Sequence, residues 1–342
     1  MNVAAASVSS GTSGNGRDAG RTVTVRLYCA RVHAVPYPGA VTDTPTTPAA
    51  PISDTALAGR GTQHWVLTLV CDDRPGIVHA ITAAIVAAAG NIAELQQFSS
   101  LDTGRFFLRL EVDTPVTRGA LLAELDPVAE RFGADIRLDI AGRPMRTLVL
   151  ASKAEHAVND LLFRQRAGHL PISVPLIMAN HPVLAPLAEF YGVPFEHLPV
   201  AGPDDKAAFE RRVLEVVEAE RIELVVLARY MQILSPELCE ALEGRAINIH
   251  HSFLPGFKGA NPYRQAHARG VKLVGATAHF VTTDLDEGPI IEQNVRRVDH
   301  ADSVAELQSM GQDEESRTLT QAVRWFAEHR ILLDGQRTIV FR

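Results

Sequence analysis

Residues 246–259 read Ala-Ile-Asn-Ile-His-His-Ser-Phe-Leu-Pro-Gly-Phe-Lys-Gly, an alternating segment that runs into a loop containing proline and glycine. Successive side chains of a β-strand point to opposite faces, so Ile247 and Ile249 share one face while Asn248 and His250 share the other. The isoleucines belong in a core. Open α/β sheets bind ligands at the carboxyl ends of their strands, and this segment therefore predicts a buried strand whose end carries a polar site.

Strands and helices alternate on both sides of this segment. The apolar periodicity predicts strands over 146–151, 172–179, 195–200, 224–228 and 274–282. Helical spacing covers 155–165, 184–191, 204–219, 236–242 and the closing stretch 304–331. Strands that alternate with helices are typical of βαβ units. We therefore predict an α/β domain over residues 144–342, built on a doubly wound, mostly parallel, Rossmann-like sheet.

A smaller unit precedes this domain. Within residues 63–143 the pattern predicts strands over 65–71, 92–100, 105–112 and 135–140, with helices over 77–89 and 118–132. The order β-α-β-β-α-β is that of a ferredoxin-like unit, and residues 141–144, Ala-Gly-Arg-Pro, are the expected linker. Residues 1–62 are rich in Ala, Ser, Thr, Gly and Pro, bury too little surface to offset their ordering entropy, and are predicted to be a disordered tail.

The composition is that of a soluble globular protein, with 46% apolar and 21% charged residues among 342. A net charge of -7 provides no basic surface for nucleic acid. No apolar run reaches the ~20 residues needed to cross a membrane, and no secretory signal is visible, so we expect a cytoplasmic protein. His251 and His279 could form a metal cluster with His250, but no further Cys, Asp or Glu falls at ligand spacing, so we expect core or supporting roles for them. The cysteines also lack metal or redox spacing and are expected to be reduced: Cys29, Cys71 and Cys239.

A carboxylate turn follows downstream. Residues 284–290 read Asp-Leu-Asp-Glu-Gly-Pro-Ile, and the Gly-Pro pair is expected to hold a turn that aims Asp286. An isolated Asn-x-His on a strand is more often structural, because polar residues at strand ends commonly satisfy loop backbone. The downstream carboxylate instead favours a catalytic trio of Asn248, His250 and Asp286.

The chain resembles the formyltetrahydrofolate deformylase family from about residue 63 to residue 342. Asp73-Arg-Pro-Gly-Ile-Val78 and Gly90-Asn-Ile92 are similar to an ACT domain, a small amino-acid-sensing module. Three further segments are similar to the formyltransferase fold that glycinamide ribonucleotide transformylase shares: Leu227-Ala-Arg-Tyr-Met-Gln-Ile-Leu-Ser235, Ile247-Asn-Ile-His250 and Leu285-Asp-Glu-Gly-Pro-Ile290. The resemblance implies a regulatory ACT domain at 63–143 and a catalytic formyltransferase-fold domain at 144–342.

The resemblance also implies functional residues. The catalytic set falls on Asn248, His250 and Asp286. The folate pocket falls on Leu227, Met231, Gln232, Ile233, Leu234, Val281, Thr282 and Leu285. The effector site of the ACT domain falls on Asp73, Arg74, Gly76 and Asn91, and its ligand would be an amino acid. Because ACT modules tend to associate side by side, the resemblance further implies a homo-oligomer.

The implied activity is hydrolysis of a linear amide, the formyl group of 10-formyltetrahydrofolate, to formate and tetrahydrofolate. Formate would supply one-carbon metabolism and purine biosynthesis. The amide of Asn248 would donate to the developing oxyanion, and the imidazole of His250 would accept a proton and return it to the leaving N10 atom. Asp286 would position the attacking water and stabilise the imidazolium. This scheme uses no metal and no cofactor.

Two rival functions remain at this point: formyl transfer to glycinamide ribonucleotide, and amino-acid sensing with a non-catalytic folate-binding domain. Transformylases of this fold hold the acceptor's phosphate with a glycine-rich loop after the first strand. Here that loop reads Ala151-Ser-Lys-Ala-Glu-His156 and contains no glycine. Ser152 and Glu155 are predicted to form a capping box that places a carboxylate where a phosphate would sit. This favours water as the acceptor, and the intact trio argues against a non-catalytic sensor.

Overall fold

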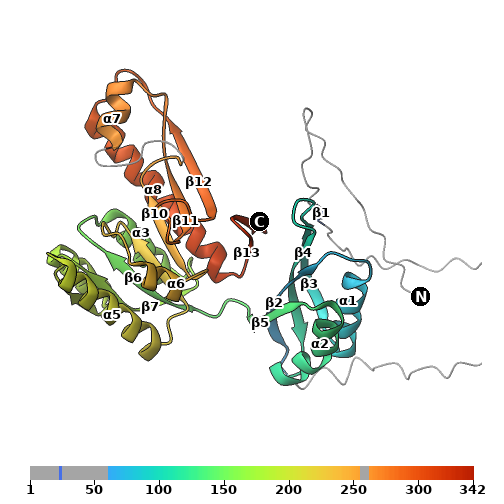
Figure 1. Cartoon of the computed structure of the whole chain (residues 1–342). Helices are drawn as coiled ribbons and strands as arrows, with labels where there is room; N and C mark the ends of the chain where they lie inside the picture. Colours follow the sequence, from blue (N-terminus) through green and yellow to red (C-terminus); the bar gives the residue numbers. More distant parts are fainter. Residues whose placement is uncertain (1–22, 25–60, 255–261) are drawn as a thin grey trace, which may run out of the picture. The chain divides into compact units, whose positions relative to one another are not determined.

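The structure, a computed structural model, describes residues 23–24, 61–254 and 262–342 (Figure 1). The chain divides into two compact units, Met1–Ala141 and Gly142–Arg342, and the division falls within the predicted linker. In the stretch predicted as a disordered tail, Val23–Thr24 form the short strand β1, which pairs antiparallel with β3 (Asn91–Ser99). The rest of that stretch up to residue 60 lies outside the described residues, as do Pro255 and Gly256 of the predicted loop.

The first unit has the predicted β-α-β-β-α-β order. Its elements are β2 (Gln63–Asp72), α1 (Ile77–Ala87), β3, β4 (Arg105–Thr114), α2 (Arg118–Phe132) and β5 (Asp135–Ile140). The strands form an antiparallel sheet in the order β3-β4-β2-β5, and β1 extends its β3 edge. Both helices cover one face of the sheet, and Leu67 and Leu69 of β2 are fully buried in the same core as Ile81 of α1 and Leu121 of α2. The predicted ferredoxin-like topology is therefore confirmed.

Local signals explain why α2 keeps its predicted bounds. The hydroxyl of Thr117 accepts a hydrogen bond from the backbone N–H of Ala120 and caps the amino terminus. Gly133 follows the last turn with φ 59°, in the left-handed conformation that commonly ends a helix. Both signals can be read from the sequence.

The second unit alternates strands and helices. Its first part contains β6 (Met145–Ala151), α3 (His156–Arg166), β7 (Ile172–Ala179), the 3₁₀ turn η2 (Pro182–Leu184), α4 (Ala185–Tyr191), β8 (Phe195–His197), α5 (Pro203–Ala219), β9 (Leu224–Ala228) and α6 (Pro236–Ala241). Its second part contains β10 (Ala246–His250), α7 (Pro262–Arg269), β11 (Leu273–Phe280), β12 (Ile290–Arg297), α8 (Val304–Ala327), β13 (Ile331–Asp334) and β14 (Arg337–Val340).

Seven strands form the central sheet of this unit in the order β12-β11-β10-β9-β6-β7-β8. The five from β10 to β8 are parallel, whereas β11 and β12 are antiparallel. The predicted doubly wound, mostly parallel sheet is confirmed. The parallel and antiparallel parts of the sheet meet at β10. This strand pairs with the parallel β9 on one side and with the antiparallel β11 on the other.

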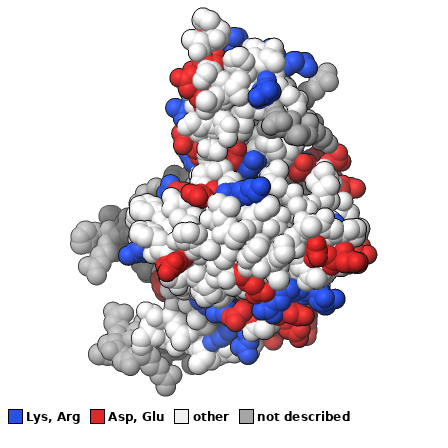
Figure 2. Space-filling model, turned by 90° about the vertical axis from the view of Figure 1, so that its left-hand side faces the viewer, with Lys and Arg blue, Asp and Glu red and all other residues white. Residues whose placement is uncertain are grey.

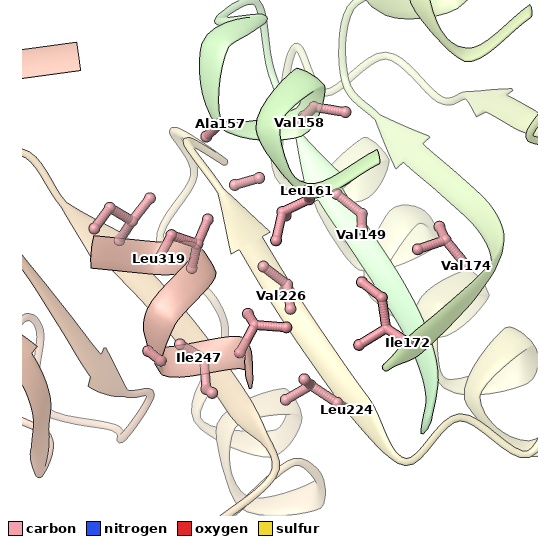
Figure 3. Packing of buried hydrophobic residues seen from close by; sticks show 14 of the residues in the cluster. Val149, Ala157, Val158, Leu161, Ile172, Val174, Leu224, Val226, Ile247 and Leu319 are labelled. Atoms are coloured by element: carbon pink, nitrogen blue, oxygen red, sulfur yellow. The ribbon is translucent and has the colours of Figure 1, made fainter. Parts of the chain in front are cut away.

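Helices pack on both faces of this sheet. On one face, Val149 of β6, Val226 of β9 and Ile247 of β10 pack with Leu161 of α3 and Leu319 of α8 (Figure 3). A second cluster joins β6 and β9 to α5 and α6. A strand that is covered by helices on both faces of the sheet buries all of its side chains. β9 therefore has the continuous apolar sequence Leu-Val-Val-Leu-Ala and not an alternating one.

Several elements differ from the prediction. The helix α7, the strand β12 and the hairpin β13–β14 were not predicted, and the closing helical stretch is the single helix α8, which ends at Ala327 and not at residue 331. β12 was not predicted because it is an edge strand. Its sequence, Ile-Ile-Glu-Gln-Asn-Val-Arg-Arg, does not alternate apolar and polar residues. A polar edge strand lacks the periodicity on which recognition depends.

The surface carries charges of both signs. On the face drawn in Figure 2, blue and red side chains of the described residues are interspersed over the second unit. Within the described ranges, no helix is long and apolar enough to span a bilayer.

Candidate active site

The strand β10 places Asn248 and His250 at the site, as its alternation predicted. Ile247 and Ile249 are 0% and 3% exposed and lie in the core under α8. The neighbouring strand β11 runs antiparallel, and the register pairs Asn248 with His279. Because cross-strand partners point to the same face, the imidazole of His279 lies beside the amide of Asn248.

His279 fixes the orientation of Asn248. Nδ1 of His279 lies 2.8 Å from the carbonyl oxygen of Phe280, which can only accept, so Nδ1 carries the proton. In the neutral ring, Nε2 is then an acceptor, and it lies 3.2 Å from Nδ2 of Asn248. One N–H of the amide is therefore engaged by His279, and the second makes no hydrogen bond to the residues that the structure describes. The sequence suggested only a core or supporting role for His279, and the structure brings it into direct contact with two of the predicted residues.

Asp286 completes the group from the loop after β11. Its Oδ2 lies 3.3 Å from Nδ1 of His250, and its Oδ1 lies 3.7 Å from Nε2 of His279. Asp286 has φ 58°, in the left-handed region that aspartate tolerates better than most residues. Gly288 sits so close to β11 that a Cβ atom there would be 1.9 Å from the carbonyl oxygen of Phe280. The predicted turn thus needs its glycine for close approach of two backbones.

The electrostatics follow from these contacts. Contact with the imidazole of His250 first, and with that of His279 second, holds the pKa of the Asp286 carboxyl far below its usual range. Asp286 is therefore a carboxylate at neutral pH. Nε2 of His250 is buried and makes no hydrogen bond within the part of the chain that the structure describes. If Nδ1 donates to Asp286, this Nε2 is the basic atom of the ring and is the one left for a substrate or water.

A cavity of about 900 Å³ surrounds these groups. All eight residues predicted to contact folate line it: Leu227, Met231, Gln232, Ile233, Leu234, Val281, Thr282 and Leu285. Met231, Ile233 and Leu285 are 59%, 62% and 57% exposed, which is unusual for large apolar side chains. The cavity therefore offers an apolar wall next to the polar trio, as a site for a mostly flat, partly apolar ligand requires.

The loop after β6 differs from its prediction. Ser152 and Glu155 do not form a capping box, because α3 has no side-chain cap and the Glu155 side chain is exposed. The buried hydroxyl of Ser152 instead accepts a hydrogen bond from the backbone N–H of Met231, at 3.0 Å. Ser152 therefore bonds to Met231, 79 positions away in the sequence, and not to the amino terminus of α3 as predicted. Ser152 thereby ties the loop after β6 to the segment after β9.

Several residues of the cavity were not predicted. Arg229, His156, Tyr263 and Glu315 line it, and the first three each contact Glu315. Arg229 lies in the segment 227–235, which carries part of the family resemblance. A charged residue within this mainly apolar segment was the one sequence signal that could have indicated its place in the site. The sequence does not indicate that Glu315 contacts the other three residues, because even Tyr263, the nearest of them along the chain, is 52 positions away. Among the described residues, no three His, Cys, Asp or Glu side chains are grouped to hold a metal ion.

The four residues predicted for an effector lie in the first unit. Asp73 and Arg74 follow β2 and are exposed, and Gly76 precedes α1 with φ 98°. Arg74 donates from Nη2 to the carbonyl oxygen of Arg131, at 2.6 Å, near the end of α2. Asn91 begins β3, after the end of α1. The structure places the four residues around the two ends of α1.

Comparisons with known proteins agree with this arrangement. A formyl transferase family model matches residues 145–323, and an ACT domain model matches residues 65–128. Formyltetrahydrofolate deformylase of Corynebacterium sp. strain P-1 is 48% identical over 81% of this chain and 98% of its own length. The crystal structure of formyltetrahydrofolate deformylase from Burkholderia mallei has a TM-score of 0.79 at 48% identity, covering 82% of this chain and 100% of that one. Glycinamide ribonucleotide transformylase 1 from Symbiobacterium toebii has a TM-score of 0.56 at 34% identity, covering 60% of this chain and 98% of that one. The chain therefore belongs to the formyltetrahydrofolate deformylase family, with an ACT domain followed by a formyl transferase domain.

Proposed function

We propose that this chain hydrolyses 10-formyltetrahydrofolate to formate and tetrahydrofolate. The observation that carries the proposal is the meeting of Asn248, His250 and Asp286 in one cavity. Asp286 lies 3.3 Å from His250 and 3.7 Å from His279, and His279 lies 3.2 Å from the amide of Asn248. The family to which the chain belongs is named for this reaction. The product formate is consistent with a supply of one-carbon units for purine biosynthesis.

Each side chain of the trio has a proposed role. The free N–H of the Asn248 amide donates to the formyl oxygen as it gains negative charge, while His279 holds the amide in place. Nε2 of His250 accepts a proton from the attacking water and returns it to N10 as the C–N bond breaks. Asp286, which is ionised, stabilises the imidazolium formed in between and orients the water. These steps use water and side chains of the chain alone, without a metal or cofactor.

The folate portion is proposed to lie along the apolar wall of the cavity. Exposed Met231, Ile233 and Leu285 would be covered by the bound ligand. Covering such side chains removes apolar surface from water and contributes roughly 25 cal/mol per Å². The remaining members of the predicted folate set supply backbone and side-chain contacts around this wall.

The first unit is proposed to bind an amino-acid effector. The match to an ACT domain supports a small-molecule effector site, and Asp73, Arg74, Gly76 and Asn91 are its proposed residues. We further propose a cytoplasmic homo-oligomer, which size-exclusion chromatography with light scattering would test. Glycine and methionine are the first effectors to try.

A formate-release assay tests the main proposal. Purified full-length protein is incubated with 10-formyltetrahydrofolate in the absence of any amine, and formate and tetrahydrofolate are measured separately. We expect the two products in equal amounts. Formation of tetrahydrofolate only when glycinamide ribonucleotide is added would instead identify a transferase. Binding of the folate without turnover would favour a non-catalytic sensor.

A further inference from the structure

A second group of cavity residues is held together by Glu315 of α8. The Glu315 side chain is 1% exposed, and its carboxylate accepts from Nε2 of His156 at 2.8 Å and from the hydroxyl of Tyr263 at 2.6 Å. Nε of Arg229 lies 3.3 Å from the same carboxylate. His156 begins α3, Tyr263 lies in α7, and Arg229 follows β9. We call these four residues the Glu315 network.

Two backbone features show that this network is closely fitted. Gly311 lies one helical turn before Glu315, and a Cβ atom there would be 2.1 Å from the hydroxyl of Tyr263. Arg229 has φ 61°, in the left-handed region that is unfavourable for a long side chain. Such conformations persist only where surrounding contacts enforce them, and they gather at functional sites. The structure thus holds Arg229 in the cavity against a local backbone preference.

The charges of the network support a fixed Arg229. Burial alone would raise the pKa of the Glu315 carboxyl, but contacts with His156, Arg229 and Tyr263 bring that pKa below its usual value, so Glu315 is ionised. Nε of Arg229 is within ion-pair distance of Glu315 without hydrogen-bond geometry, and Nη1 is buried and makes no hydrogen bond among the described residues. The Arg229 side chain is 18% exposed. It therefore fills its part of the cavity instead of extending into solvent.

The pKa of His251 shows the electrostatic effect of Arg229 within the cavity. Its ring centre lies 5.0 Å from that of His250, so it is adjacent to the proposed reaction centre. Burial first, and Arg229 second, lower the pKa of His251 to about 4. A positive charge is thus disfavoured at His251, next to His250. The same field would disfavour an acceptor amine that arrives as an ammonium ion.

We propose that Arg229, held by Glu315, determines specificity by occupying the place that an acceptor amine would need, so that water is the acceptor of the formyl group. The inference rests on the proposed deformylase function. Proteins named as transformylases share this fold, so the fold itself admits both reactions. A water molecule needs only ~30 Å³, and even a small amine such as glycinamide needs several times that space.

The two reactions compete for one carbon atom. In hydrolysis, the water oxygen bonds to the formyl carbon, the bond from that carbon to N10 breaks, and N10 takes up a proton while formate leaves. In transfer, an amine nitrogen bonds to the same carbon and gives up a proton, and N10 again leaves protonated. Both reactions release tetrahydrofolate, so the fraction of turnover that yields formyl-amine measures the choice of acceptor directly.

The test compares this fraction in matched variants. Arg229→Gly and Arg221→Gly are assayed with 10-formyltetrahydrofolate and a high concentration of glycinamide, and formate and N-formylglycinamide are both quantified. Arg221 is the matched control, because it is an exposed arginine with φ 50° outside the cavity lining. We expect Arg229→Gly to raise the formylglycinamide fraction roughly tenfold or more, and Arg221→Gly to leave it at the wild-type value.

Every other outcome is informative. An unchanged fraction in Arg229→Gly overturns the inference, even if total turnover falls, because Arg229 would then act in the chemistry or in folding alone. If Arg229→Gly does not fold, Arg229→Asn, which also tolerates the left-handed backbone, and Glu315→Gln replace it, and a wild-type fraction in both overturns the inference. Absence of formate from the wild-type enzyme would instead refute the proposed function.

Discussion

The turn after β2 and the turn after β11 have related sequences but different surroundings. Asp73-Arg-Pro-Gly76 and Asp286-Glu-Gly-Pro289 each combine an aspartate with a neighbouring glycine and proline. All of the first turn is exposed, whereas the Asp286 side chain is 16% exposed and contacts two buried imidazoles. Turn residues thus predict the shape of a turn. The chemistry of its carboxylate depends on the side chains that other strands bring to it.

The largest effect is expected when the buried carboxylate is neutralised. Asp286→Asn keeps the shape of the side chain but removes the charge that stabilises a protonated His250. We expect formate release to fall roughly a thousandfold or more, with folate affinity little changed. Asp72→Asn, at the exposed end of β2 directly before the first turn, is the control and should retain normal turnover. Near-normal turnover of Asp286→Asn would remove Asp286 from the mechanism.

A smaller loss is expected when the oxyanion donor is removed. Asn248→Ala should lower kcat by roughly a hundredfold, since one preorganised donor is lost. His279→Gln should cost less, about tenfold, because it leaves the Asn248 donor in place and disturbs its positioning and the contact with Asp286. If His279 acts through Asn248, the double variant should be no slower than Asn248→Ala. Additive losses would show that His279 has an independent role.

The sequence predicted those parts of the site that lie on regular, buried elements. β10 forms within the segment predicted to be a buried strand, because Ile247 and Ile249 alternate with Asn248 and His250. The partner of Ser152 was predicted wrongly, because the predicted capping box considered only local contacts while Met231 lies 79 residues away. The contact of Arg229 with Glu315 could not be predicted either. It depends on a loop conformation and on the packing of α8, which no periodicity encodes.

The glycines of the two turns sharpen the comparison, since each is needed for a different reason. Gly76 has φ 98°, and a Cβ there would make only an ordinary contact, 3.9 Å from the Phe132 ring, so Gly76→Ala should cost about 1–2 kcal/mol through backbone strain. Gly288 has no such φ, but a Cβ there would overlap the Phe280 carbonyl oxygen, and Gly288→Ala should cost about 1–3 kcal/mol.

Asparagine separates these two causes. Asparagine tolerates positive φ better than alanine does, so Gly76→Asn should have a higher Tm than Gly76→Ala. Gly288→Asn should have a Tm no higher than Gly288→Ala and should also lose turnover, because the Asp286 turn moves. Equal behaviour of the two positions in thermal unfolding would contradict the assignment of close approach to Gly288.

The smallest effect concerns pH, where two histidines of the two units are expected to act with opposite signs. Burial alone would lower the pKa of His64, but hydrogen bonds to Asp113 and Glu111 raise it above its usual value. Its contribution to stability is therefore complete below the unfolded pKa of about 6.5 and is lost as pH rises through the folded pKa. The pKa of His251 is lowered to about 4, so the unfolded state takes up its proton first as pH falls. Stability linked to His251 is complete above about pH 6.5 and declines towards pH 4.

Thermal unfolding of His64→Gln and His251→Gln between pH 4 and pH 8 tests these signs. Relative to wild type, His251→Gln should lose less Tm as pH falls below the ordinary histidine range, because it has no proton to take up on unfolding. His64→Gln should lose less Tm as pH rises, and the difference should be small because 42% of the His64 side chain is exposed and water screens its ion pairs. Both effects are differences between curves measured in the same buffers, so other titrating groups cancel. Parallel curves for either variant and wild type would show that the histidine titrates alike in the folded and unfolded states, and the environment described for it would then be wrong.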